Sequence, residues 1–242
     1  MLELCEVAVL QRREVAAKVA APMADRWATF DCYGTLIDWE GGIAGALSEL
    51  WPDVGRERLL ADYHAVEPRI QAGRDLSYRE VMRRAAAAVG AIEGVEMPSG
   101  REGALAESLP SWSPFPEVPD ALAEARDAGW KPAILSNTDP DLLASSIEAL
   151  GVPFDLLVTA SDAGSYKPAP GHWERFASEL DNAPDPHAHV AASLFHDVEP
   201  CSRLGIDCVW INRLGEQSEL PRAAEQPDLS GLAATLGRIA SS

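Results

Sequence analysis

The chain has 242 residues, enough for one large α/β domain or for a core that carries a second, inserted domain. Hydrophobic residues make up 47% of it, which allows a sizeable buried core, while no stretch approaches the roughly 20 apolar residues of a membrane-spanning helix. The formal net charge of −18 argues against nucleic acids and anionic membranes as partners, because both would repel the chain.

The N-terminal segment and the cysteines carry little functional signal. Residues 1–22 have two acids near their start and arginines after a short apolar run, unlike a signal peptide, so we interpret them as an N-terminal extension. The four cysteines, Cys5, Cys32, Cys201 and Cys208, form no C-x-x-C pair and no metal-binding cluster with histidine. We therefore expect reduced thiols and a cytoplasmic location.

Apolar runs typical of buried strands alternate with helical patterns along the rest of the chain. Strands are predicted at residues 27–33, 131–137, 154–160, 189–195 and 207–212. Helices are predicted at residues 41–51, 56–73, 77–92, 117–128, 139–150, 169–180 and 198–204. The alternation predicts a doubly wound α/β fold with a parallel sheet.

The first two predicted strands are separated by about 95 residues of mostly helical pattern. A crossover between parallel strands needs only about 30 residues, so the excess predicts an inserted helical domain. We place this cap domain at residues 41–113 and the core domain at residues 23–40 and 114–242. The proline-rich stretch "LPSWSPFPEVP" is the predicted return hinge.

Polar side chains gather where the predicted strands end, at the edge where open α/β sheets bind ligands. Asp31 follows the first strand and precedes a glycine turn with a hydroxyl, in the stretch "DCYGT". A carboxylate beside a hydroxyl and the exposed backbone N–H groups of a turn can act as a nucleophile. The alternative interpretation of Asp31 is an acid in a turn that caps the next helix. Ser136-Asn137, the stretch "SYKPAP" and His196-Asp197 follow later strands.

These four stretches, taken in order, resemble the motifs of the haloacid dehalogenase superfamily. "FDCYGTLID" resembles its first motif, D-x-x-G-T-L, and "ILSNTD" is similar to its second. "SYKPAP" is similar to the third, and "LFHDVEPCSRLGI" to the fourth. Order and spacing agree over residues 26–215, and the resemblance implies a Rossmann-like core with a helical cap inserted after the nucleophile.

The resemblance implies a role for each matching position. Asp31 is the nucleophile, Lys167 neutralises charge beside it, and Asp197 orients Lys167 or the hydrolytic water. Thr35 and Ser136 hold anionic oxygens of the substrate, with Asn137 as a neighbouring polar contact. The alternatives are a solvated loop lysine for Lys167 and helix caps for Asp197 and Asn137.

Tyr33 favours carbon–halogen cleavage over phosphoryl transfer. Phosphatases of the superfamily have an aspartate there, which protonates a leaving alcohol, and a tyrosine with a pKa near 10 is a weak acid for this task. A halide needs no proton, and type II 2-haloacid dehalogenases are similar to this chain at Tyr33. The usual Mg²⁺-binding acid falls at Ser193, so no metal ligands are predicted and metal binding is disfavoured.

Several positions depart from the dehalogenase pattern. In those enzymes an arginine of the cap lies near the departing halide, and the best alignment places Asp62 at that position. Arg69 or Arg74 takes the place of this arginine only if the helix is shifted relative to that alignment. Trp173 stands in place of a tyrosine, Leu194 of an asparagine and His196 of a tryptophan. His196 is either a base for water or a structural residue. Further candidates for the pocket are Trp39, Tyr63, Trp112, Trp173, His64, Glu67 and Arg69.

The sequence therefore predicts a hydrolase that uses Asp31 to dehalogenate a small 2-haloacid, with a small anionic substrate and no cofactor. One alternative is a Mg²⁺-dependent phosphatase or phosphonate hydrolase on the same scaffold. Another is a non-catalytic protein that binds a metabolite. The resemblance alone also suggests a homodimer.

Overall fold

The computed structural model describes residues 25–72, 76–180 and 184–241. The predicted N-terminal extension, Cys5 and Arg74 lie outside the described residues. Six parallel strands form one sheet in the order β3-β2-β1-β4-β5-β6. Their bounds are β1 (Arg26–Phe30), β2 (Trp130–Ser136), β3 (Leu156–Thr159), β4 (His187–Ala191), β5 (Asp207–Ile211) and β6 (Ala224–Gln226).

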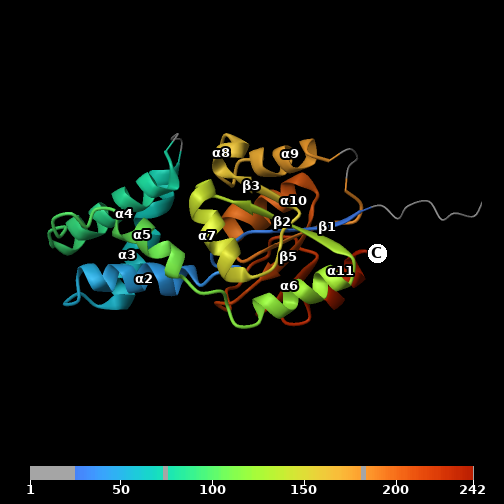
Figure 1. Cartoon of the computed structure of the whole chain (residues 1–242), viewed down its shortest axis with the longest axis horizontal. Helices are drawn as coiled ribbons and strands as arrows, with labels where there is room; N and C mark the ends of the chain where they lie inside the picture. The colour runs from blue at the N-terminus through green and yellow to red at the C-terminus, as the bar shows by residue number, and fades with distance from the viewer. Residues whose placement is uncertain (1–24, 73–75, 181–183, 242) are drawn as a thin grey trace, which may run out of the picture.

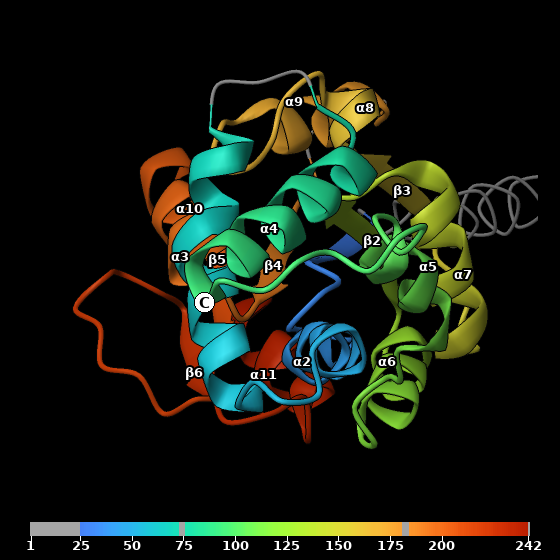
Figure 2. The same cartoon turned by 90° about the vertical axis from the view of Figure 1, so that its left-hand side faces the viewer.

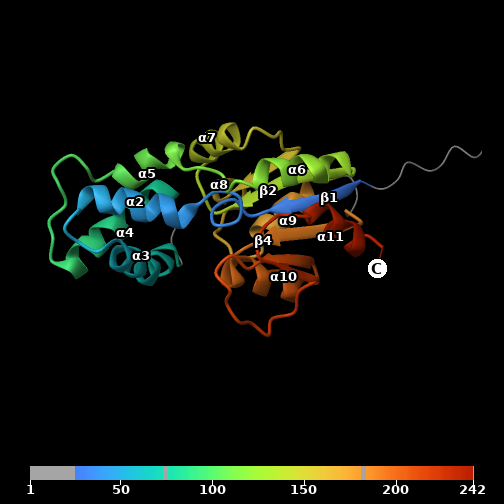
Figure 3. The ribbon, with the colours of Figure 1, turned by 90° about the horizontal axis from the view of Figure 1, so that it is seen from below.

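Helices cover both faces of the sheet, because alternate strand residues point to opposite sides and both sides are apolar. Phe30, Ile134 and Val209 belong to one core cluster with α6 (Val118–Asp127), α7 (Pro140–Leu150) and α11 (Leu232–Ile239). Trp27, Leu135 and Trp210 belong to a second cluster with α9 (Gly171–Ser178) and α10 (Glu199–Leu204). Figure 3 shows the sheet between these layers, which confirms the doubly wound α/β fold.

Four helices form a separate lobe beside one end of the sheet (Figures 1 and 2). They are α2 (Trp39–Leu50), α3 (Arg56–Gln71), α4 (Tyr78–Glu93) and α5 (Ala104–Ser108), called the helical lobe below. The Asp38 and Ser77 side chains cap α2 and α4 by accepting backbone N–H groups. The two segments that connect the helical lobe to the sheet run side by side, because the Asp38 amide of one donates to the Ser113 carbonyl of the other at 3.0 Å.

One predicted strand differs in a way that shapes the site. The strand predicted at 189–195 ends at Ala191, and Leu194–Val198 (η2) forms a π-helical turn instead. The Ser193 hydroxyl starts this turn by accepting the His196 backbone N–H at 3.0 Å, and such a local bond outweighs the apolar pattern. The pattern also missed α5, α11 and β6, which are eight residues long or shorter.

A search for helices of membrane-spanning length and hydropathy found none in the described residues. Cys32, Cys201 and Cys208 are free and buried. The structure also contains a short helix, α8 (Ala160–Ala163), after β3.

Candidate active site

Lys167 is the centre of a buried charge cluster at the carboxyl end of the sheet. Its Nζ donates to Asp31 Oδ1 at 2.8 Å, to Asp197 Oδ1 at 2.6 Å and to the Leu135 carbonyl at 2.8 Å. These bonds use all three ammonium protons. Burial alone would lower the pKa of Lys167, but the carboxylates of Asp197 and Asp31 outweigh it and raise that pKa above its ordinary value. Lys167 is therefore a permanent cation.

The end of β1 holds Asp31 in place. The Asp31 amide donates to the Val190 carbonyl of the neighbouring strand at 3.1 Å, and Gly34 turns the chain with a φ of 87°. This turn brings the Thr35 hydroxyl to Asp31 Oδ2, to which it donates at 3.0 Å. The same hydroxyl accepts the Ala192 amide at 2.9 Å, so both Asp31 oxygens have a defined donor.

Asn137, just after β2, holds the backbone of Lys167. Its side-chain amide donates to the Lys167 carbonyl at 3.0 Å, and its oxygen accepts the Lys167 amide at 2.7 Å. This two-way contact fixes the loop that carries the ammonium group. Asn137 is therefore bonded to Lys167 rather than to the N-terminus of α7, where no side-chain cap is present.

Asp197 has a second buried partner that the sequence reading did not include. His189 Nε2 lies 2.9 Å from Asp197 Oδ1, and His189 Nδ1 lies 2.9 Å from the Thr29 hydroxyl. Burial alone would raise the pKa of Asp197, but Lys167 and His189 outweigh it and lower that pKa below its usual range. Asp197 Oδ2 is buried without a hydrogen-bond partner, so one oxygen remains available to a ligand or water.

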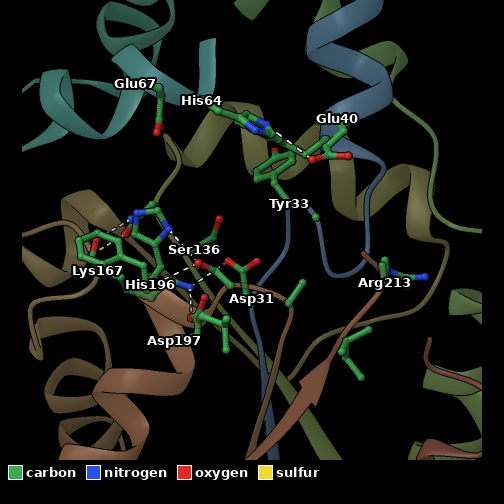
Figure 4. A pocket seen from close by; sticks show the side chains of 18 of the residues that line it. Asp31, Tyr33, Glu40, His64, Glu67, Ser136, Lys167, His196, Asp197 and Arg213 are labelled. Carbon is green, nitrogen blue, oxygen red and sulfur yellow. Dashed lines mark hydrogen bonds and ion pairs between the residues drawn. The ribbon is translucent and has the colours of Figure 1, made fainter. Parts of the chain in front are cut away.

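A cavity of about 610 Å³ opens above this cluster, between the sheet and the helical lobe (Figure 4). The Ser136 hydroxyl lines it and is buried without a hydrogen-bond partner. Tyr33 also lines it, with its hydroxyl 2.8 Å from Ser146 Oγ, and burial raises the pKa of Tyr33 well above its ordinary value. Burial lowers the pKa of His196, so its ring is neutral at pH 7.

The cavity brings most of the sequence-predicted site residues together. Those that line it are Asp31, Tyr33, Trp39, His64, Glu67, Ser136, Asn137, Lys167, His196 and Asp197. They come from five separate segments of the chain: the segments around Asp31, Ser136, Lys167 and Asp197 follow strands of the sheet, whereas His64 and Glu67 come from α3 of the helical lobe.

Three predicted substrate contacts lie elsewhere. Thr35 is fully buried behind Asp31, and its hydroxyl is used up by the two bonds described above. Trp173 packs edge-on against His189 beneath the cavity, because it lies on the buried face of α9. Arg69 is exposed on the outer face of α3, where the helix register turns it away from the cavity. Tyr63 and Trp112 are core residues and do not line the cavity.

Several residues of the site were missed. Arg213 follows β5, lines the cavity and donates through Nη2 to the Thr35 carbonyl at 2.8 Å and to Glu117 at 2.7 Å. The strand-end rule applied to residues 207–212 would have found it. His189 is the first residue of an apolar run that was predicted as a strand, so nothing in the sequence indicated that it belongs to the site. Glu40, Gln71 and Tyr78 also line the cavity and belong to lobe helices whose packing the sequence does not fix.

The donor set does not fit a Mg²⁺ ion. Mg²⁺ takes oxygen ligands in octahedral geometry, commonly including one or two carboxylates. Of the carboxylates at the cluster, Asp31 has both oxygens bonded to donors, and Asp197 Oδ1 is shared by Lys167 and His189. Asp197 Oδ2 has no donor, but it is a single ligand and not the set that Mg²⁺ needs. In the part of the chain that the structure describes, no three His, Cys, Asp or Glu residues are arranged to hold a metal.

The parallel sheet carries a charge cluster at its strand ends, and a cavity lies above that cluster. A family model described as haloacid dehalogenase-like hydrolase matches residues 26–205, and the chain therefore belongs to this family. This confirms the family and the fold class that the motifs predicted.

Individual relatives agree with this assignment. The chain is 27% identical over 223 residues to (S)-2-haloacid dehalogenase 1 of Pseudomonas sp. (strain CBS-3), covering 86% of this chain and 93% of that protein. It shares its fold with L-2-haloacid dehalogenase from Xanthobacter autotrophicus at a TM-score of 0.78 and 22% identity, covering 89% and 99% of the two chains. A phosphoserine phosphatase of Thermus thermophilus is 32% identical over 117 residues, covering 48% of this chain and 46% of that enzyme.

Proposed function

We propose that this enzyme hydrolyses a carbon–halogen bond of a small 2-haloacid, with Asp31 as the nucleophile. The observation that carries the proposal is the position of Asp31, whose carboxylate faces the cavity while Lys167 ties it to Asp197. The names of the haloacid dehalogenases reported above agree with it.

The first step forms an ester. An Asp31 oxygen attacks the substrate carbon that bears the halogen, a carbon–oxygen bond forms, and the halide leaves with the bonding electron pair. Lys167 and Thr35 hold the carboxylate in one orientation for this attack. No proton is needed for the leaving group, which suits a site whose neighbouring Tyr33 has a raised pKa.

The second step regenerates the enzyme. Water adds to the carboxyl carbon of the Asp31 ester, the hydroxy acid leaves, and the water proton is released. Asp197 lines the cavity and its Oδ2 has no partner among the described residues, so this oxygen is the one that accepts the water's hydrogen bond. The helical lobe covers the cavity on the side opposite the sheet, which limits the access of bulk water during both steps.

A Mg²⁺-dependent phosphatase is the second candidate, favoured by the partial match to phosphoserine phosphatase. In that reaction Mg²⁺ would supply charge neutralisation at the phosphoryl group. The donor set described above does not fit this ion, so we derive no step through it.

A parallel assay for halide and phosphate release, with and without Mg²⁺, tests the proposal. We expect halide release from short 2-chloro- or 2-bromoacids without added metal, and its loss in Asp31→Asn. Metal-stimulated phosphate release that Asp31→Asn abolishes would favour the phosphatase instead. Inactivity toward both substrate classes, with tight binding of a metabolite, would favour the non-catalytic alternative.

A further inference from the structure

The cavity has more carboxylates than free cations. Asp31, Asp38, Glu40, Glu67, Asp197 and Glu216 line it. The described lining residues include one lysine, Lys167, and one arginine, Arg213. Both side chains form ion pairs with carboxylates of the protein. Lys167 has used its three protons, and Arg213 is paired with Glu117 at 2.7 Å, while its Nε is buried without a hydrogen-bond partner. A substrate whose only charge is negative is therefore repelled by the excess of negative charge that lines the cavity.

Glu67 is the acid whose position most needs an explanation. It lies on α3 in a buried stripe with Leu59, Tyr63 and Gln71, spaced four residues apart, and only 5% of it is exposed. Gln71 Nε2 donates to one of its oxygens at 2.5 Å. Figure 4 shows the Glu67 carboxyl pointing from α3 into the cavity, toward the sheet.

Burial raises the pKa of Glu67 to about 7, and among the described residues no cation offsets this effect. The titratable groups facing Glu67 are Tyr63 on its own helix, Tyr78 on α4 and Tyr166 on the loop before Lys167. The pKa of each tyrosine is raised, so all three are neutral near pH 7. A buried carboxylate without a cation is costly, and an apolar residue in this stripe would pack at lower cost.

The wall around Glu67 also carries aromatic faces. Trp39 lines the cavity, stacks on His64 with ring centroids 5.2 Å apart, and donates from Nε1 to the Tyr78 hydroxyl at 3.1 Å. An aromatic face beside a buried carboxylate is the environment that stabilises an ammonium group, through cation–π attraction and a charge-assisted hydrogen bond. A cavity of about 610 Å³ also has room for more than a two- or three-carbon acid.

We infer that the substrate carries an ammonium group at the end remote from the reacting carbon, and that Glu67 binds it against Trp39 and Tyr78. The inference rests on the proposed function for the position of the reacting carbon. It makes Glu67 a specificity-determining residue and the substrate class an amino-substituted 2-haloacid. The ammonium group supplies the positive partner that Glu67 lacks among the described residues.

Binding of product analogues tests this without turnover. The probes are straight-chain 2-hydroxy acids of three to six carbons, each compared by calorimetric titration with the same acid bearing a terminal amino group. For the best-fitting length, we expect the amino compound to bind at least about tenfold more tightly, about 1.4 kcal/mol. That preference should grow as the pH rises through 7, because Glu67 then ionises while the amine stays protonated.

Two variants complete the test. Glu67→Gln should reduce the preference to near unity with little change for the parent hydroxy acid. Glu57→Gln removes the same charge from an exposed position on the same helix and should leave the preference intact. The inference is overturned if no amino compound binds better than its parent, or if the preference survives Glu67→Gln. Since no halide release is involved, these results are separate from failure of the dehalogenation assay.

Discussion

The two walls of the cavity differ in how their charges are balanced. On the sheet wall, the Asp31 and Asp197 carboxylates share the Lys167 ammonium group through bonds of 2.8 and 2.6 Å. On the lobe wall, Glu67 is buried, and no cation of the described residues offsets its burial. The charged groups of the sheet wall are thus positioned before the substrate binds, as a catalytic site requires. On the lobe wall, we infer that the ligand supplies the cation that pairs with Glu67. The difference separates the residues that perform the reaction from those that select the substrate.

Replacement of the nucleophile should have the largest effect. Asp31→Asn removes the attacking oxygen and leaves the Lys167–Asp197 pair intact, so we expect kcat for halide release to fall by roughly 10⁴-fold or more. Steady-state assays of halide release measure this, and circular dichroism checks that the variant folds. Retention of more than a tenth of the activity would contradict the role of Asp31 and leave the sheet wall without its function.

Removal of the shared cation should cost stability as well as activity. Lys167→Met leaves two buried carboxylates without their shared cation, and we expect the free energy of unfolding at pH 7 to fall by about 3–5 kcal/mol. The deficit should shrink at acid pH. In the wild type, the lowered pKa of Asp197 contributes stability that is present above pH 4 and lost as the pH falls further. Urea unfolding at pH 7, pH 4 and several values between pH 4 and pH 2 measures both effects.

The lobe wall should show the opposite pH dependence. The pKa of Glu67 is raised from 4.5 to about 7, so the neutral acid favours folding below pH 4.5, and this contribution is lost as the pH rises to 7. Relative to the wild type, Glu67→Gln should therefore gain about 2–3 kcal/mol of stability between pH 4.5 and pH 8. Urea unfolding across this range, with Glu57→Gln as the control, is the measurement. A difference that does not change with pH would mean that Glu67 is ionised normally.

The smallest expected effect concerns the support beneath Asp197. His189→Leu removes the bonds to Asp197 and Thr29, while Asp197 keeps Lys167 and Thr29 keeps His187, so we expect a loss of about 1–2 kcal/mol. His189→Gln, which retains a donor, should recover part of that loss. His187→Leu is the control, because the His187 ring contacts the same Thr29 hydroxyl but not Asp197. Equal losses for His187→Leu and His189→Leu would show that the Asp197 contact adds no stability.

The sheet wall was more predictable from the sequence than the lobe wall, for a physical reason. Parallel strands end at a common edge, so Asp31, Ser136 and Asp197 converge once the strands are recognised. Which residues of the helical lobe line the cavity depends on how α2 and α3 pack, and this packing is not evident from the sequence. Successive side chains of a helix are rotated by about 100°, so Glu67 faces the cavity while Arg69, two residues later, faces away from it. Local bonding also escaped prediction, as in the turn that the Ser193 hydroxyl starts.

The origin of the oxygen in the product tests the central claim most directly. With enzyme in excess over a 2-haloacid in ¹⁸O-labelled water, the first turnover should give a hydroxy acid whose new oxygen is unlabelled, because that oxygen comes from Asp31. The label should then appear in the Asp31 carboxylate and be found by mass spectrometry of the peptide that contains it. Immediate labelling of the product, with Asp31 unlabelled, would contradict the ester route.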